Sequence, residues 1–145
     1  MRALVQRVTQ ARVLVDGRVV GETGPGLCCL VGVTHGDDRG SAVKLAAKIW
    51  RLRVFADESG HMNRPVAEAG GEVLVVSQFT LYGDTRKGRR PSFMAAAAPD
   101  EAARLIDELV TELRRLGATV ATGAFGAHMA LELTNDGPVT LMLEV

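Results

Sequence analysis

The chain has 145 residues, of which 47% are hydrophobic and 23% charged, a composition that excludes a disordered protein. Its 17 basic and 17 acidic residues give a formal net charge of zero, which excludes a chain-wide field that would draw nucleic acid or membrane. No apolar segment has the length of a signal-peptide core or a bilayer span, so we expect residues 1–145 to form a single cytoplasmic domain.

A β-hairpin is predicted near the start of the chain. Apolar and polar residues alternate with a rough period of two over residues 2–20, as in a strand with one buried face. Asp16-Gly17 is a typical two-residue hairpin turn. We therefore expect strands at about 2–15 and 18–22.

The apolar segment 27–33 is predicted to be a central strand, because both of its faces would carry apolar side chains. It includes the adjacent residues Cys28 and Cys29. A strand directs neighbouring side chains to opposite faces, and a disulfide between neighbours would be strained. We interpret both cysteines as buried thiols in a reducing compartment.

Two segments have the periodicity of amphipathic helices. The first is expected at about 38–52, with Asp37 or Asp38 as its N-cap. The second begins at Pro99, which is followed by acidic residues, and ends near Arg115, where basic residues complement the helix dipole.

The remaining segments complete an α+β domain. In chain order we expect a short strand at 53–55, a polar loop at 57–65, a strand at 72–76, and strands at 118–122, 129–135 and 139–144, the last two joined by a turn at 135–138. Strands in hairpins with two helices laid across them predict a mainly antiparallel sheet. The face that the helices leave bare favours a homodimer.

The segment Ser77–Leu81 (SQFTL) closes the strand predicted at 72–76 and is the strongest candidate for a site. The N–H groups of Phe79 and Thr80, held by the sheet, can bind the developing oxyanion of an ester or amide, with Ser77 and Gln78 orienting them. No base is visible in the local sequence to activate the Thr80 hydroxyl as a nucleophile. The alternative, which spacing alone favours, is a strand end whose hydroxyls satisfy its own turn.

A basic loop follows this segment. Arg86, Lys87, Arg89 and Arg90 place four cations around Gly88. The loop would suit a phosphodiester backbone, or it is simply solvated.

Two glycine-containing segments near the C-terminus also have two interpretations. Gly137-Pro138 is either a tight turn or, with a cis bond, a rigid pair of carbonyl acceptors that can bind an ammonium group. The small residues at 123–127 either let backbones pack closely or leave room for a ligand.

No metal or cofactor site is predicted. His35, His61 and His128 lie far apart in the sequence without a ligand pair, and no CxxC pair is present. Glycine-rich nucleotide motifs are also absent.

Three motifs together resemble the D-aminoacyl-tRNA deacylase family: SQFTL at 77–81, KGRRPSF at 87–93 and NDGPVT at 135–140. The resemblance extends over essentially the whole chain. It implies hydrolysis of the ester between a D-amino acid and the 3′-terminal adenosine of tRNA, a chiral proofreading step in translation. Mischarged glycine is a possible further substrate. A binding module without turnover and a small-molecule esterase are the alternatives.

The resemblance also implies where the site residues lie. It implies a homodimer in which the sheets of both subunits form a barrel-like core. In this dimer a cis Gly137-Pro138 peptide enters the partner's site beside SQFTL, holds the substrate's amino group and excludes L side chains. The implied catalytic residues are Phe79 and Thr80, supported by Ser77 and Gln78. Phe125, Met129, Gly137 and Pro138 would contact the substrate, and Arg86, Lys87, Arg89 and Arg90 the tRNA.

Two positions depart from the family's pattern. His128 stands where an acid is usual, near the expected pocket, so substrate preference or pH response could differ. Pro65 stands where serine is usual, which we interpret as loop variation.

Overall fold

The sheet is built around the long strand β1 (Arg2–Val15), which pairs with other strands along both of its edges. The computed structural model describes residues 1–145. One edge of β1 pairs first with β3 (Gly26–Gly32) and then with β2 (Arg18–Thr23), and the other edge pairs with β8 (Ala130–Glu144). All three pairings are antiparallel, and the predicted hairpin at Asp16-Gly17 is confirmed.

Two further strands make the sheet mixed. Strand β6 (Glu72–Ser77) is parallel to β3, and β7 (Val120–Thr122) is parallel to β6. The prediction of a mainly antiparallel sheet is therefore not confirmed. The reason is that helices α1 (Arg39–Arg51) and α3 (Pro99–Arg115) lie on the connections between these strands and return the chain to the end at which the previous strand began.

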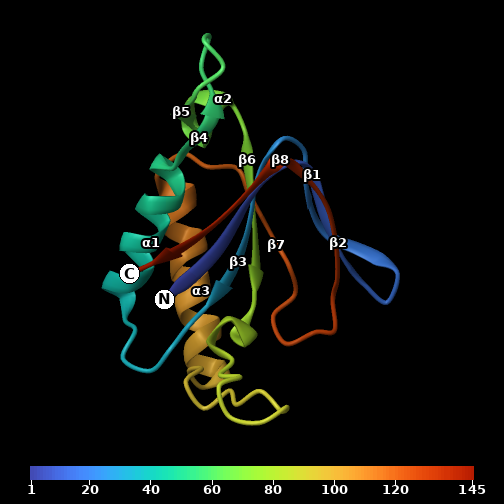
Figure 1. Cartoon of the computed structure of the whole chain (residues 1–145), viewed down its shortest axis with the longest axis vertical. Helices are drawn as coiled ribbons and strands as arrows, with labels where there is room; N and C mark the ends of the chain where they lie inside the picture. The colour runs from blue at the N-terminus through green and yellow to red at the C-terminus, as the bar shows by residue number, and fades with distance from the viewer.

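The sheet curls until its first and last strands approach one another (Figure 1). In the order β2-β1-β3-β6-β7, β2 and β7 are the ends. A Cβ placed on Gly21 would lie 2.1 Å from the Thr122 carbonyl oxygen, so only glycine permits this approach. The sheet of one chain is thus nearly closed and barrel-like.

The strand expected at 118–122 is present as β7. The prediction that residues 129–144 form a hairpin of two strands is wrong. A single strand, β8, runs through both segments and pairs with β1 along most of its length. The register shifts between Gln6, which pairs with Thr140, and Val8, which pairs with Asn135. The residues around Gly137-Pro138 therefore form a bulge within β8 rather than a turn that reverses the chain.

The predicted loop at 57–65 also contains structure. Strand β4 (Arg53–Ala56) pairs with β5 (Met62–Pro65) in a separate two-stranded sheet. The four-residue helix α2 (Val66–Ala69) follows directly.

Both predicted long helices are confirmed. Asp38 caps α1, accepting a hydrogen bond from the Ser41 N–H at 2.8 Å, and this bond lowers the pKa of the Asp38 carboxyl. Asp37 instead accepts from the Thr34 N–H. Pro99 stands in the first turn of α3, as expected. Neither helix, nor any other in the chain, is long and apolar enough to cross a membrane.

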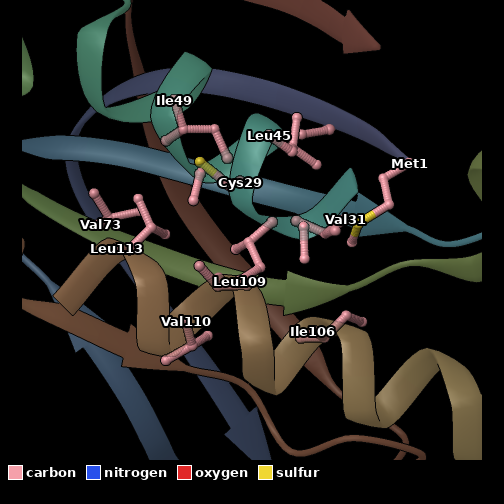
Figure 2. Packing of buried hydrophobic residues seen from close by; sticks show 14 of the residues in the cluster. Met1, Cys29, Val31, Leu45, Ile49, Val73, Ile106, Leu109, Val110 and Leu113 are labelled. Carbon is pink, nitrogen blue, oxygen red and sulfur yellow. The ribbon is translucent and has the colours of Figure 1, made fainter. Parts of the chain in front are cut away.

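The two faces of the sheet bury separate apolar clusters. The larger cluster of 22 residues fills the space between the sheet and helices α1 and α3, where Leu45, Ile49 and Leu109 meet Cys29 and Val31 (Figure 2). The smaller cluster lies on the other face. Its six members are Val8, Ala11, Val13, Cys28, Leu74 and Val76.

Cys28 and Cys29 lie on opposite faces of β3, buried and unpaired, as the sequence indicates. Burial raises the pKa of the Cys28 thiol to about 12 and that of Cys29 well above its usual value. Both sulfurs therefore remain protonated, and they act as apolar packing groups rather than nucleophiles.

Candidate functional site

The SQFTL segment leaves the sheet after its first residue. Strand β6 ends at Ser77, and Phe79–Tyr82 forms a single 3-10 turn, η1. The Gln78 N–H donates to the Val31 carbonyl of β3 at 2.7 Å, which fixes the start of this turn. The N–H groups of Phe79 and Thr80 are therefore positioned by the turn and not, as expected, by the sheet. N–H groups at the start of a helical turn have no acceptor within it.

A cavity of about 360 Å³ lies beside this turn. Its lining comes from the ends of β3 and β6, from the first turns of α3 and from two loops. The lining residues are Val31, Val33, Ser77, Gln78, Phe79, Phe93, Ala96, Ala97, Pro99, Ala102, Ile106, Phe125 and Gly126. Figure 1 shows η1 and the start of α3 at one end of the molecule.

Three of the chain's four phenylalanines gather at this cavity. Phe79 is 56% exposed and Phe125 45% exposed, although both are large apolar side chains. The ring of Phe93 packs edge-on against Phe79, with 5.1 Å between centroids and 73° between ring planes. Exposed aromatic rings around an apolar hollow present surfaces on which a planar ligand can stack.

The segment 94–97, which forms part of the cavity wall, is hydrogen-bonded to the segment between β3 and α1. The Thr34 hydroxyl donates to the Ala95 carbonyl at 2.5 Å, and the Ala97 N–H donates to the Val33 carbonyl at 3.0 Å. The His35 ring lies 2.9 Å from the Met94 carbonyl. His35 therefore holds this wall, and it does not line the cavity.

The lining contains no ionisable side chain. The hydroxyl in the lining belongs to Ser77, whereas Thr80 follows Phe79 in the turn and is not a lining residue. The Thr80 hydroxyl accepts a hydrogen bond from the Gln78 side-chain amide. No histidine, carboxylate or amine contacts it. The chain also contains no cluster of three metal-ligating side chains. The groups available for chemistry are hydroxyls, the Gln78 amide and the backbone.

The basic loop is held at its base. Asp84 and Ser92 exchange two backbone hydrogen bonds, of 2.8 and 2.9 Å. The Asp84 carboxylate accepts two hydrogen bonds from the Arg86 guanidinium, which lowers the pKa of Asp84 to about 2 and raises that of Arg86. Arg86 is thereby neutralised, which leaves the free charge of the loop on Lys87, Arg89 and Arg90.

The Gly137-Pro138 bulge lies on β8, away from the cavity of its own chain. The peptide bond between the two residues is cis. The Arg7 guanidinium braces the bulge, with Nε 3.0 Å from Asp136 Oδ2, and its other end donates to the Val54 carbonyl. Asn135 Oδ1 accepts from the Val139 N–H at 3.1 Å. Sequence reasoning did not single out Arg7; the one available signal was an arginine at a half-buried strand position.

The segment 123–127 lies between the smaller apolar cluster and the cavity. At one end, a Cβ on Gly123 would lie 2.8 Å from the sulfur of Met129, which packs against the smaller cluster rather than lining the cavity. At the other end, Phe125 lines the cavity. His128 is exposed and Pro65 precedes α2, and neither residue lines the cavity.

Replacing Gly137 with alanine should reduce the free energy of unfolding by about 1–3 kcal/mol. Its φ is +122°, and a Cβ there would lie 2.9 Å from a methyl of Val139 and 3.1 Å from the Arg7 guanidinium. Urea denaturation measures the loss. Gly60→Ala is the matched control, because Gly60 has a φ of +82° and open space around it. Equal losses in the two variants would contradict this account of the crowded bulge.

Comparisons with known proteins agree over the full length of the chain. The model of the family described as D-Tyr-tRNA(Tyr) deacylase matches residues 4–144. A D-aminoacyl-tRNA deacylase of Heliobacterium modesticaldum is 63% identical over 99% of this chain and 96% of that protein. A protein of the same name from Deinococcus radiodurans is 54% identical over the whole of both chains.

Two solved structures have the same fold. One is described as "c-Myc DNA Unwinding Element Binding Protein", with a TM-score of 0.95, 39% identity and coverage of 100% of this chain and 99% of that one. The other is a probable eukaryotic D-amino acid tRNA deacylase, with a TM-score of 0.83, 18% identity and coverage of 99% and 98%. The second similarity supports the fold alone. The family match and the identities together show that this chain belongs to the D-Tyr-tRNA(Tyr) deacylase family, and it is a hydrolase acting on ester bonds.

Proposed function

We propose that the chain acts as one deacylase domain that hydrolyses the ester between a D-amino acid and the 3′-terminal adenosine of tRNA. The observation that carries this proposal is the apolar cavity beside SQFTL, which has three phenylalanines and no ionisable side chain. Relatives that are 54–63% identical over the whole chain carry the name D-aminoacyl-tRNA deacylase.

The dimensions and chemistry of the cavity fit the end of an aminoacyl-tRNA. A volume of about 360 Å³ lies within the usual range for small-ligand pockets. An unpaired adenine can stack on an exposed aromatic ring such as Phe79, Phe93 or Phe125. The apolar surface from α3, including Ala102 and Ile106, would exclude water around the ester.

The proposed mechanism uses the backbone rather than an ionisable side chain. Water attacks the ester carbonyl carbon, and the N–H groups of Phe79 and Thr80 stabilise the oxyanion that forms. When this intermediate collapses, the bond to the ribose oxygen breaks and a proton from the water passes to that oxygen, with the substrate's 2′-hydroxyl as relay. The products are the D-amino acid and a free tRNA end. Ser77 and Gln78 hold the turn in position.

Selectivity is proposed to come from a second subunit. The Gly137-Pro138 bulge is exposed on β8, an edge strand whose residues are all partly or fully exposed. In a homodimer this bulge would enter the partner's cavity, and its carbonyl groups would hold the substrate's ammonium group. A D side chain, or the hydrogen of glycine, would then point into space, whereas an L side chain would collide with protein. Rejection of L-aminoacyl-tRNA makes this a proofreading step in translation.

The first experiment compares the hydrolysis of D-tyrosyl-tRNA, L-tyrosyl-tRNA and a free D-tyrosine ester by the purified protein. Release from the D-aminoacyl-tRNA alone is expected, and radiolabelled amino acid released over time measures it. Equal release from both tRNAs would contradict the selectivity. Release from the free ester alone would indicate an ordinary esterase.

Nucleic-acid binding without turnover is the second candidate function. It is favoured by the similarity to the DNA unwinding element binding protein and by the three unpaired cations of the loop, Lys87, Arg89 and Arg90. Tight binding of tRNA or DNA with no release of amino acid in the same assay would support it.

Replacing Thr80 with alanine should retain deacylation within about 10-fold of the wild type, because no base activates this hydroxyl and the backbone N–H remains. Single-turnover rates with D-tyrosyl-tRNA measure the effect. Thr80→Ser is the matched control, since it keeps the hydroxyl. Complete loss in Thr80→Ala, with full activity in Thr80→Ser and unchanged tRNA affinity, would make Thr80 the nucleophile.

A further inference from the structure

We propose that the exposed face of α1 binds the phosphate backbone of an RNA duplex, the stem of the tRNA whose 3′ end occupies the cavity. This inference rests on the proposed function and extends it to a surface outside the SQFTL site and the basic loop. Four basic residues carry it: Lys44, Lys48, Arg51 and Arg53. They are called the α1 stripe.

Charge is unevenly divided between the two long helices, which lie side by side against the sheet (Figure 1). Helix α1 contains four basic residues and no acidic one. Helix α3 contains five acidic and three basic residues. In a chain whose formal net charge is zero, α1 therefore forms a local positive surface to which a polyanion is attracted.

Three members of the α1 stripe lie on one face of the helix because of their spacing in the sequence. Lys44, Lys48 and Arg51 stand at intervals of four and three residues, so they share one face over a rise of about 10 Å. All three are exposed. The opposite face of the helix is buried, including Leu45 and Ile49. Arg53 is also exposed and extends the stripe beyond the end of the helix.

These four cations line a hollow and form no salt bridge. The hollow has a volume of about 790 Å³ and is lined by Lys44, Ala47, Lys48, Arg51, Leu52, Arg53, Leu143 and Val145. None of the four cations forms a salt bridge with a carboxylate, whereas Arg39 of the same helix lies 3.4 Å from Glu108 and is left out of the stripe.

Two members of the stripe are held by backbone carbonyls. Lys48 Nζ donates to the Glu144 carbonyl at 2.7 Å, and Arg53 Nε donates to the Asn63 carbonyl at 2.7 Å. These bonds position the two side chains without removing their charge. A hollow lined by four cations, two of them fixed, is complementary to the convex, regularly charged backbone of a duplex.

The direction of α1 connects the stripe with the cavity. Thr34, just before the helix, forms a β-bridge with Ala96, which lines the cavity. The helix thus begins close to the cavity wall and carries its cations away from it. A duplex that leads away from a bound 3′ end can follow the same direction.

The experiment measures the affinity of uncharged tRNA by fluorescence anisotropy at several salt concentrations. In Lys44→Gln/Arg51→Gln, the slope of log K against log salt should fall by about 2 units, at about 0.9 for each lost phosphate contact. At 0.15 M salt this corresponds to about 30-fold weaker binding, or about 5-fold per contact. Glutamine has a helix propensity close to those of lysine and arginine, so α1 should remain folded.

Arg18→Gln is the matched control for Arg51→Gln. Arg18 is exposed, forms no salt bridge and lies in the β1–β2 hairpin, on the other side of the molecule from α1 (Figure 1). Its replacement should leave affinity within about 2-fold of wild type. Equal affinities for Arg51→Gln and Arg18→Gln would overturn the proposal. It would also be overturned if the double variant changed the sedimentation mass but kept the affinity, because the stripe would then be a contact between copies.

Kinetics separate this proposal from the proposed function. With D-tyrosyl-tRNA the double variant should show a raised KM, and with D-tyrosyl-adenosine, which lacks the duplex, unchanged kinetics. If the wild type hydrolyses neither substrate, the proposed function fails, and the anisotropy titration still decides whether the stripe binds RNA. An equal rise of KM on both substrates would overturn the proposal.

Discussion

The parallel pairing of β3 with β6 is the constraint on which the site depends. It places Val31 beside Ser77 at the ends of two neighbouring strands that are largely buried. Because the Val31 carbonyl accepts from the Gln78 N–H, the chain can turn at once into η1. The same end of the sheet receives the first turns of α3, so a cavity forms where the two strands and the helix meet.

This arrangement explains why the proposed chemistry uses the backbone. An ionisable group would be expensive to bury among apolar lining residues such as Val33, Ala102 and Ile106. Backbone N–H groups carry no net charge and are fixed by the local turn, so they can stabilise an oxyanion without reorganising. The charged groups lie instead on the basic loop and the α1 stripe, where phosphates can reach them from solvent.

Much of the fold follows from local sequence signals. Asp16-Gly17 identified the first hairpin, and the helical periodicity behind Asp38 and Pro99 identified both long helices. The course of β8 could not be predicted. The residue types at Gly137-Pro138 favour a chain-reversing turn, but β8 instead pairs with the distant strand β1 on both sides of this dipeptide. The SQFTL motif and Phe125 lie at the cavity, but the bracing of the bulge by Arg7 depends on a contact between residues far apart in the sequence.

The comparison of Phe79→Pro with Phe79→Ala tests the backbone role most directly. Both variants lose the aromatic ring, and only proline removes the N–H. Proline is tolerated at the first position of a helical turn, and Gln78 before it has a φ of −148° and a ψ of 78°, outside the helical region that a following proline disfavours. We predict that single-turnover deacylation of D-tyrosyl-tRNA is about 100- to 1,000-fold slower in Phe79→Pro than in Phe79→Ala. Equal rates in the two variants would contradict the account.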